Sequence, residues 1–334
     1  MEPFSLIRPR TLKAARDRVT GAADTRVFKA GAIDLLDLLK EGLARPGELV
    51  DLHSLQDAEG AAMRALALAE GRWSIGALNT LATIAASGLP EPYAALKEAA
   101  GSAATPGIRN RATLGGNLLQ RPRCWYFRHG DLGCLKKGGE SCLADGGENK
   151  YHAILGGGPC HIVHPSTLAV ALVALGAEVE VVGDAGARTI GVEQLFALPR
   201  TSPLTEHTLA PGEVIRAVRL PEAPASQRSV YEVAKEKQSF DWPLAEVAAA
   251  IVVEGGSIRS AQIGLGHVAP VPWRAVQLEQ ALVGQAPSAD LFARVAPLAT
   301  QGARPLGQNA YKIKLTQGLV RAALHRACGI DVPA

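Results

Sequence analysis

The chain of 334 residues has few of the features that mark membrane, secreted or nucleic-acid-binding proteins. Its formal net charge is only +3, which gives no basic surface for nucleic acid. The longest apolar run of the second half, residues 168–175, has the length of a core helix and is too short to span a membrane. A charged-then-apolar signal segment is missing at residues 1–4, which favours the cytoplasm. With 47% apolar and 20% charged residues, the composition is typical of a globular protein of about two domains.

Cysteine is also scarce, but four of the five cysteines fall within one short segment. They are Cys124, Cys134, Cys142 and Cys160, separated by 9, 7 and 17 residues. Glycine and lysine rather than apolar residues fill the gaps, so the segment cannot build a core of its own. Thiolates that converge on a metal centre would order such a segment, because metal binding contributes to folding free energy.

Three interpretations of these cysteines are open. Disulfides are disfavoured by the missing signal segment, since reducing compartments rarely keep them. Zinc usually takes paired Cys-x2-4-Cys knuckles, which are absent, and no H-x-x-x-H pair is present. An iron–sulfur cubane fits the long and unequal spacing better, because its four iron corners are spread in space. We expect the fifth cysteine, Cys328, to be a buried or partly buried small residue of an apolar C-terminal helix pattern.

Two turns rich in small residues could bind an anion. Adjacent glycines in the turn from Thr113 to Asn117 allow positive φ and could direct successive N–H groups into one concavity. A similar strand, turn and helix start occurs at residues 28–35. Together the two turns could hold the two phosphates of one dinucleotide, although an ordinary Gly-Gly turn is the more frequent explanation of such a pair.

Three segments of the chain match motifs of a known family: residues 108–118 around Thr-x-Gly-Gly-Asn, residues 126–128, and His-Pro-Ser at 164–166. Through them the chain resembles the FAD-binding subunits of the molybdenum hydroxylases. That family includes xanthine dehydrogenase, carbon monoxide dehydrogenase and aldehyde oxidoreductases. Looser matches occur at residues 76–81, 266–275 and 310–312, so essentially the whole chain is covered. The four-cysteine segment resembles the subset whose flavin subunit also carries a 4Fe-4S cluster, represented by periplasmic aldehyde oxidoreductase.

The resemblance implies a fold, cofactors and partners. The fold is α+β: a two-lobed FAD-binding domain of the PCMH/vanillyl-alcohol-oxidase kind, then a smaller α+β C-terminal domain. The cluster ligands would be Cys124, Cys134, Cys142 and Cys160. Residues expected at the FAD are Lys29, Ala30, Gly31, Ala32, Ile33, Asp34, Leu35, Asn110, Thr113, Gly115, Gly116, Asn117, Ser166 and Lys235. We expect a heterotrimer with a molybdenum-cofactor large subunit and a 2Fe-2S small subunit, in which this chain passes electrons to an external acceptor.

Several expectations stay open. Where the family commonly has Gly-Gly-Thr, this chain has Gly31-Ala32-Ile33, and Thr167 replaces a carboxylate after His-Pro-Ser. Trp242 could stack near the flavin or pack in the core. Alternative functions are a stand-alone flavin oxidoreductase and a non-redox zinc-binding module. The compartment could also be the periplasm, through export on a partner's signal.

The periodicity predicts alternating elements in the first half. Strands are expected at 25–29, 48–51, 73–75 and 178–182, and helices at 34–40, 79–86, 93–100 and after Ser166 as a helix cap. Residues 221–226 read as a linker, followed by strands at 230–233, 244–254 and 257–265 and by helices from about Trp273. We therefore expect an FAD domain at 1–222, with lobes of about 1–55 and 56–222 and the cysteine insert at 120–162, and a C-terminal domain at 226–334.

Overall fold

A small parallel sheet forms the first part of the chain. In the computed structural model, which describes residues 1–22, 25–69, 71–237 and 240–331, its strand order is β1 (Ser5–Ile7), β3 (Glu48–Asp51), β2 (Arg26–Lys29). The helices α1 (Leu12–Val19) and α2 (Ile33–Lys40) connect these strands. Parallel neighbours need a crossover connection, and the two helices supply it. A turn of three residues, 30–32, leads from β2 into α2.

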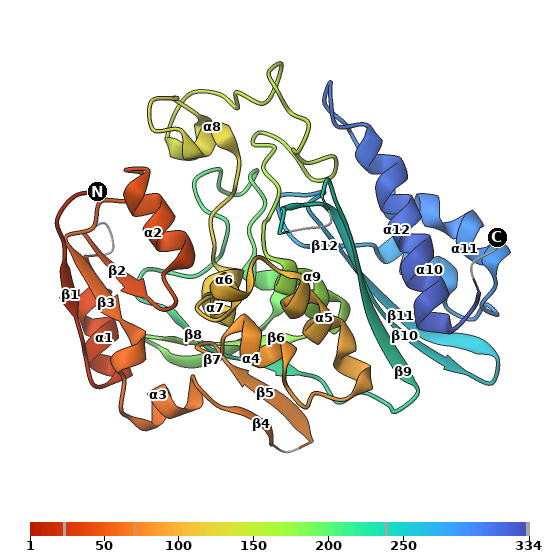
Figure 1. Cartoon of the computed structure of the whole chain (residues 1–334), viewed down its shortest axis with the longest axis horizontal. Helices are drawn as coiled ribbons and strands as arrows, with labels where there is room; N and C mark the ends of the chain where they lie inside the picture. Colours follow the sequence, from red (N-terminus) through yellow and green to blue (C-terminus); the bar gives the residue numbers. More distant parts are fainter. Residues whose placement is uncertain (23–24, 70, 238–239, 332–334) are drawn as a thin grey trace.

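The second part is a larger antiparallel sheet covered by short helices. Its strands follow the order β4 (Leu66–Ala69), β5 (Arg72–Gly76), β8 (Val214–Leu220), β6 (Glu178–Gly183), β7 (Gly186–Gly191). Above it lie α4 (Leu81–Ala85), α5 (Ala94–Ser102), α6 (Pro106–Arg109), α7 (Leu114–Leu118) and α9 (Thr167–Ala174) (Figure 1). A further short helix, α3 (Ala58–Ala62), precedes β4. Every residue of α9 is buried, which explains why its sequence is apolar all round.

The C-terminal part is a four-stranded antiparallel sheet with order β12 (Trp273–Arg274), β11 (Ser257–Gly266), β10 (Pro243–Glu254), β9 (Gln227–Lys235). Alternate residues of β10 belong to two different cores: Ala248 and Ala250 pack with α9, whereas Val247 and Ala249 pack in the C-terminal core that includes α12 (Tyr311–Cys328). Because side chains alternate across a strand, both faces of β10 are buried. The sheet thus attaches the C-terminal helices α10 (Val276–Leu282), α11 (Ala289–Val295) and α12 to the rest of the molecule.

The cysteine-rich insert between α7 and α9 has little regular structure. It contains one helical turn, α8 (Trp125–Arg128), and a 3-10 turn at Leu135–Lys137. In Figure 1 it lies above the middle of the molecule, between α2 on one side and α12 on the other. No helix in the described residues is long and apolar enough to cross a membrane.

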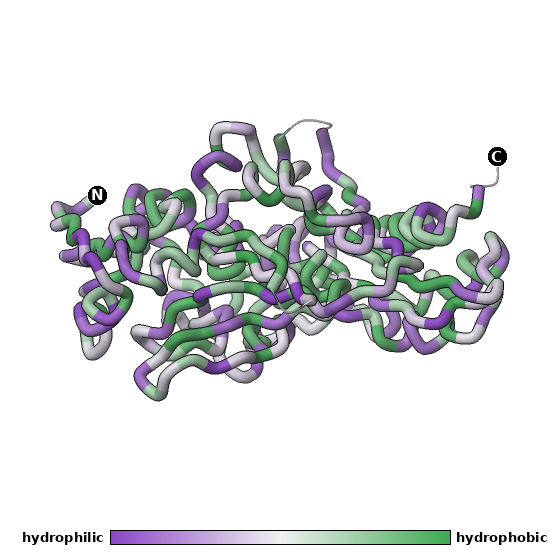
Figure 2. The backbone as a smooth tube through the Cα atoms, turned by 90° about the horizontal axis from the view of Figure 1, so that it is seen from below, coloured by the Kyte–Doolittle hydropathy of each residue, from purple (hydrophilic) through white to green (hydrophobic). Residues whose placement is uncertain are grey.

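The mixed helix and strand content expected from the sequence is confirmed. One expectation is wrong: the segment at Trp273 is not helical, because Trp273 and Arg274 pair with Leu265 and Gly264 as an edge strand before α10 begins. Residues 332–334, to which the expected terminal helices extended, and Gln238 and Ser239 lie outside the described residues. Figure 1 and Figure 2 show an elongated molecule, with the small parallel sheet at one end and the C-terminal helices at the other.

Candidate functional site

A cavity of about 430 Å³ lies where the three parts of the chain meet. The first lobe contributes the turn after β2, the second lobe contributes the glycine turn, and the C-terminal sheet contributes the segment from β9 to β10. Eleven of the expected flavin residues line it: Ala30, Gly31, Ala32, Ile33, Asp34, Leu35, Thr113, Gly115, Gly116, Asn117 and Lys235. The two turns singled out in the sequence are therefore brought together at one cavity.

The first turn, between β2 and α2, leaves backbone N–H donors available to a ligand. Gly31 is required because a Cβ there would lie 1.9 Å from the carbonyl oxygen of Arg111. Ala32 follows with φ 64° and caps α2 without a side-chain hydrogen bond. A helix start leaves its first N–H groups without intrahelical partners, and here no cap side chain takes them. The first turn of α2 thus offers backbone N–H groups to an anion, as the sequence indicated for this turn.

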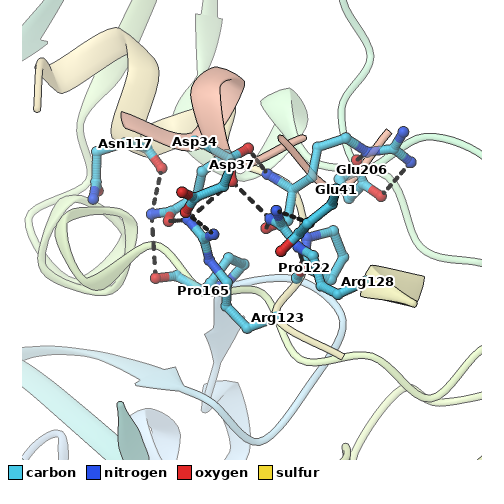
Figure 3. Close-up of polar contacts among 11 residues, drawn as sticks. Asp34, Asp37, Glu41, Asn117, Pro122, Arg123, Arg128, Pro165 and Glu206 are labelled. Atoms are coloured by element: carbon cyan, nitrogen blue, oxygen red, sulfur yellow. Dashed lines mark hydrogen bonds and ion pairs between the residues drawn. The ribbon is translucent and has the colours of Figure 1, made fainter. Parts of the chain in front are cut away.

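Asp34, the second residue of α2, is held by three arginines of the insert (Figure 3). Its carboxylate accepts hydrogen bonds from the backbone N–H of Arg121 at 2.8 Å and from the guanidinium of Arg128 at 2.7 Å. Arg123 forms a further ion pair with it at 2.9 Å. The Asp34 side chain is only 14% exposed. Although it lines the cavity, its described partners belong to the insert.

The glycine turn at residues 113–117 lines the cavity as expected. The expectation that its glycines direct backbone N–H groups into the cavity is wrong. Neither Gly115 nor Gly116 has positive φ, and their N–H groups donate to Ala77 O and Thr113 Oγ1. A Cβ on Gly115 would lie 3.2 Å from Ala77 Cβ, so glycine permits close packing of α7 onto that segment. The turn therefore supplies a smooth cavity wall rather than a set of free backbone donors.

Asn117 is the polar side chain that this turn presents to the cavity. Ser166, buried at the start of α9, donates from its hydroxyl to Asn117 Oδ1 at 2.7 Å and accepts from Ala169 N–H at 3.1 Å. Ser166 is thus the expected helix cap, and it does not itself line the cavity. Lys29 and Asn110 also lie outside the lining; Lys29 pairs with Asp51 at 3.1 Å. The assignment of these three residues to the cofactor stays a prediction.

The C-terminal sheet closes the cavity with one cation and exposed aromatics. Lys235 donates from Nζ to Ser102 O at 2.9 Å. Trp242 is 48% exposed, which excludes the core-packing alternative, and the guanidinium of Arg123 lies 4.9 Å from its ring centroid. An exposed ring at the mouth of a cavity can stack on a planar ligand.

The four cysteines of the insert surround a second, much smaller cavity. Cys124, Cys134, Cys142 and Cys160 all line it, with His152 and Lys136 beside them. All five cysteines are free thiols, so no disulfide forms. No group of three or more His, Cys, Asp or Glu side chains in the described ranges is placed to hold a metal ion.

The small cavity combines buried or half-buried thiols with a few polar side chains. Burial raises the pKa of the Cys124 thiol to about 11, and its sulfur lies 3.3 Å from His152 Nε2. A hydrogen bond from Cys160 lowers the pKa of Cys142 to about 5. Lys136 is buried and pairs with Glu206 at 2.8 Å. Four thiols with a buried cation nearby are suited to a centre that carries negative charge.

Sequence reasoning missed the arginines and His152. Arg123 precedes the first cysteine and lines the large cavity, but the sequence around it indicated only a resemblance to the family and no role for this side chain. His152 was set aside with the other histidines because no paired spacing includes it. Both reach their sites through an irregular loop, for which sequence periodicity carries no information.

Comparisons with known proteins agree with this geometry. Residues 2–223 match the family model described as the FAD binding domain in molybdopterin dehydrogenase, and residues 229–327 match the CO dehydrogenase flavoprotein C-terminal domain. The aldehyde oxidoreductase FAD-binding subunit PaoB of Escherichia coli is 33% identical over 96% of this chain and 95% of that protein. The carbon monoxide dehydrogenase medium chain of Afipia carboxidovorans is 27% identical over 97% and 96%.

Solved structures show the same fold. The Cu,Mo-CO dehydrogenase in its cyanide-inactivated form superposes with a TM-score of 0.77 and 23% identity, over 99% of this chain and 100% of that chain. Quinoline 2-oxidoreductase from Pseudomonas putida gives 0.72 over 98% of both. The family models together span nearly the whole chain. This protein therefore belongs to the FAD-binding medium subunits of the molybdenum hydroxylase family.

Proposed function

We propose that the chain is the electron-transfer subunit of an aldehyde-oxidising molybdenum hydroxylase and carries both FAD and a 4Fe-4S cluster. It would work with a molybdenum-cofactor large subunit and a 2Fe-2S small subunit, and pass electrons to an external acceptor. The 33% identity to an aldehyde oxidoreductase FAD-binding subunit supports the substrate class. The observation that carries the proposal is that four buried or half-buried cysteines of one insert line a single cavity beside the flavin cavity.

The large cavity fits the flavin. Backbone N–H groups at the start of α2, the Asn117 side chain and Lys235 are polar groups spread along one cavity with otherwise mainly small and apolar walls. This is the usual composition of a cofactor site, in which few polar groups set the orientation. Bound FAD supplies the redox chemistry, and the residues of this chain bind and orient it and exclude water. Within the described cavity we assign no side chain as a general acid or base.

The four cysteines suit a cubane better than a single metal ion, and the cavity between them, about 10 Å³, must widen to hold one. A structural zinc ion draws its ligands to about 2.3 Å from one centre. The described side chains show no such convergence on one ion, yet all four thiols face one space. A cubane holds its cysteines at four separate corners, so it needs a shared cavity rather than a single point. The buried Lys136, whose ammonium group pairs with Glu206, lies beside the cysteines.

The test is the cofactor content of the complex purified anaerobically with its partner subunits. We expect one FAD per chain, and iron and acid-labile sulfide in excess of what the small subunit binds. Cys134→Ser should remove that excess, whereas Cys328→Ser, outside the cavity, should keep it. Flavin without excess iron would refute the cluster, and stoichiometric zinc without flavin would refute the whole proposal.

A further inference from the structure

The walls of the flavin cavity and of the cysteine cavity are formed by adjoining residues of the chain. Residues 120–123 include three that line the flavin cavity, and Cys124, Tyr126 and Phe127, which follow directly, line the cysteine cavity. Helix α2 connects the two as well. It begins in the flavin turn, and Leu38, one of its buried residues, lines the flavin cavity and packs with Phe127 and Cys134.

Partly buried ion pairs hold these walls together. Arg128 donates to Asp34 at 2.7 Å and to Glu41 at 3.1 Å, both on α2, and also to the carbonyls of Arg121 and Pro122 (Figure 3). Its side chain is only 10% exposed. Pairs removed from solvent are screened little, so they constrain geometry more than surface pairs do. Arg128 therefore fixes the start of the cysteine insert against α2.

Arg123 has one hydrogen-bond donor without a partner among the described residues at this junction. Its Nη atoms face Asp34, Asp37 and Gln120, while its buried Nε has no hydrogen-bond partner in the described part of the chain. A buried donor without a partner is costly and calls for a ligand or an ordered water. Arg123 also lines the flavin cavity, so one side chain pairs with α2 and borders the proposed FAD site.

We propose that the two cofactor sites bind cooperatively: the Arg123, Arg128 and Asp34 network couples FAD binding on one side to cluster binding on the other. The inference rests on the proposed function, since it requires the cluster. Ordering the cysteine insert positions Arg123 and α2 for FAD. Thermodynamic linkage requires that FAD stabilises the cluster by the same factor.

The experiment is a double-mutant cycle on FAD affinity in the full complex, with flavin removed and titrated back. Cys142→Ser removes a cluster ligand that does not line the flavin cavity. Arg128→Lys keeps the charge but loses the several-fold donation of the guanidinium. We expect Cys142→Ser to raise the FAD Kd about tenfold in the wild type and much less in Arg128→Lys, within the 5–150-fold range of such couplings. Arg72→Lys, whose ion pair with Glu178 lies at neither cavity, is the control.

Equal effects of Cys142→Ser in both backgrounds, or no effect at all, would overturn the coupling. The reciprocal readout is the rate at which a chelator removes iron: FAD should slow it in the wild type and slow it less in Arg128→Lys. Thermal unfolding of Arg128→Lys shows whether the variant is folded at the titration temperature. The iron content of the wild-type protein is measured first. A missing cluster would refute the proposed function, whereas a cluster that is present but does not affect FAD affinity would refute only the coupling.

Discussion

At the scale of single residues, the flavin turn after β2 places different constraints on two neighbouring residues, one on space for a side chain and one on backbone conformation. Gly31 has ordinary φ but no room for a side chain, because the Arg111 carbonyl lies against it. Ala32 has room for its methyl group but adopts left-handed backbone at φ 64°. The left-handed region costs a non-glycine residue about 1–2 kcal/mol. Strain of this kind is kept where the surrounding structure imposes it, here at the start of α2.

The strain at Ala32 gives a prediction. Ala32→Gly should stabilise the protein by about 0.5–1 kcal/mol, because relief of the left-handed strain exceeds the extra entropy of glycine in the unfolded chain. Urea unfolding of the full chain measures the change. Ala30→Gly is the matched control in the same turn, where φ is not positive, and it should destabilise by a similar amount. A loss of stability in Ala32→Gly equal to that of the control would contradict the account.

The sequence predicted which segments line the site, but not how the residues of each segment contribute to it. Both turns reach the cavity as expected, because small residues between a strand and a helix have local geometric causes. The glycines of the second turn serve packing against Ala77 instead of exposing N–H groups, a contact between segments far apart in the chain. Arg123 and His152 depend on the same kind of long-range contact. Local pattern shows which residues are small or polar, but not what lies opposite them.

At the scale of elements, α9 connects the sheet, the glycine turn and the C-terminal domain. It is buried all round and packs against β10 and β11. Its cap, Ser166, satisfies Ala169 N–H and also holds Asn117 by its amide oxygen. One hydroxyl therefore joins helix stability to the orientation of a cavity side chain.

Two serine caps allow these effects to be separated. Ser166→Ala should cost about 1–2 kcal/mol of unfolding free energy for the cap and also weaken FAD binding severalfold, because Asn117 loses its partner. Ser288→Ala removes the exposed cap of α11 and should cost about 1 kcal/mol with FAD affinity unchanged. Urea unfolding and flavin titration give both quantities. Equal FAD affinities in the two variants would show that Asn117 is positioned without Ser166.

Most long elements were predictable and short edge elements were not. The strands β10 and β11 and helix α2 have strong periodic patterns, and their bounds agree with expectation to within a residue or so. The strand β12 is only two residues long and exists through pairing with β11, so its own residues carry no pattern. The sequence motifs were enough to predict the fold class. The edge strand β12 could not be predicted, because it depends on hydrogen bonding to a strand elsewhere in the chain.

At the scale of the whole molecule, the cysteine insert is held between the first lobe and the C-terminal helices. Opposite the arginine network, Asn309 donates to the carbonyls of His152 and Ala153, and Lys312 donates to Tyr151 O and His267 O at 2.7 Å each. Lys312 is 1% exposed, and burial lowers its pKa to about 7. These bonds attach α12 both to the insert and to the turn after β11. A segment without a core of its own thus depends on distant parts of the chain for its order.

Lys312 should therefore stabilise the insert from outside it. Lys312→Met leaves two carbonyls without their donor, and we expect a loss of about 2–6 kcal/mol, since each buried unsatisfied group costs about 1–3 kcal/mol. Lys314→Met, two residues along and exposed, should change stability by less than about 0.5 kcal/mol. Urea unfolding measures both, and limited proteolysis should cut the insert faster in Lys312→Met only. If both variants lose little stability and resist protease equally, the insert keeps its order without α12, and the arginine network on α2 is its principal support.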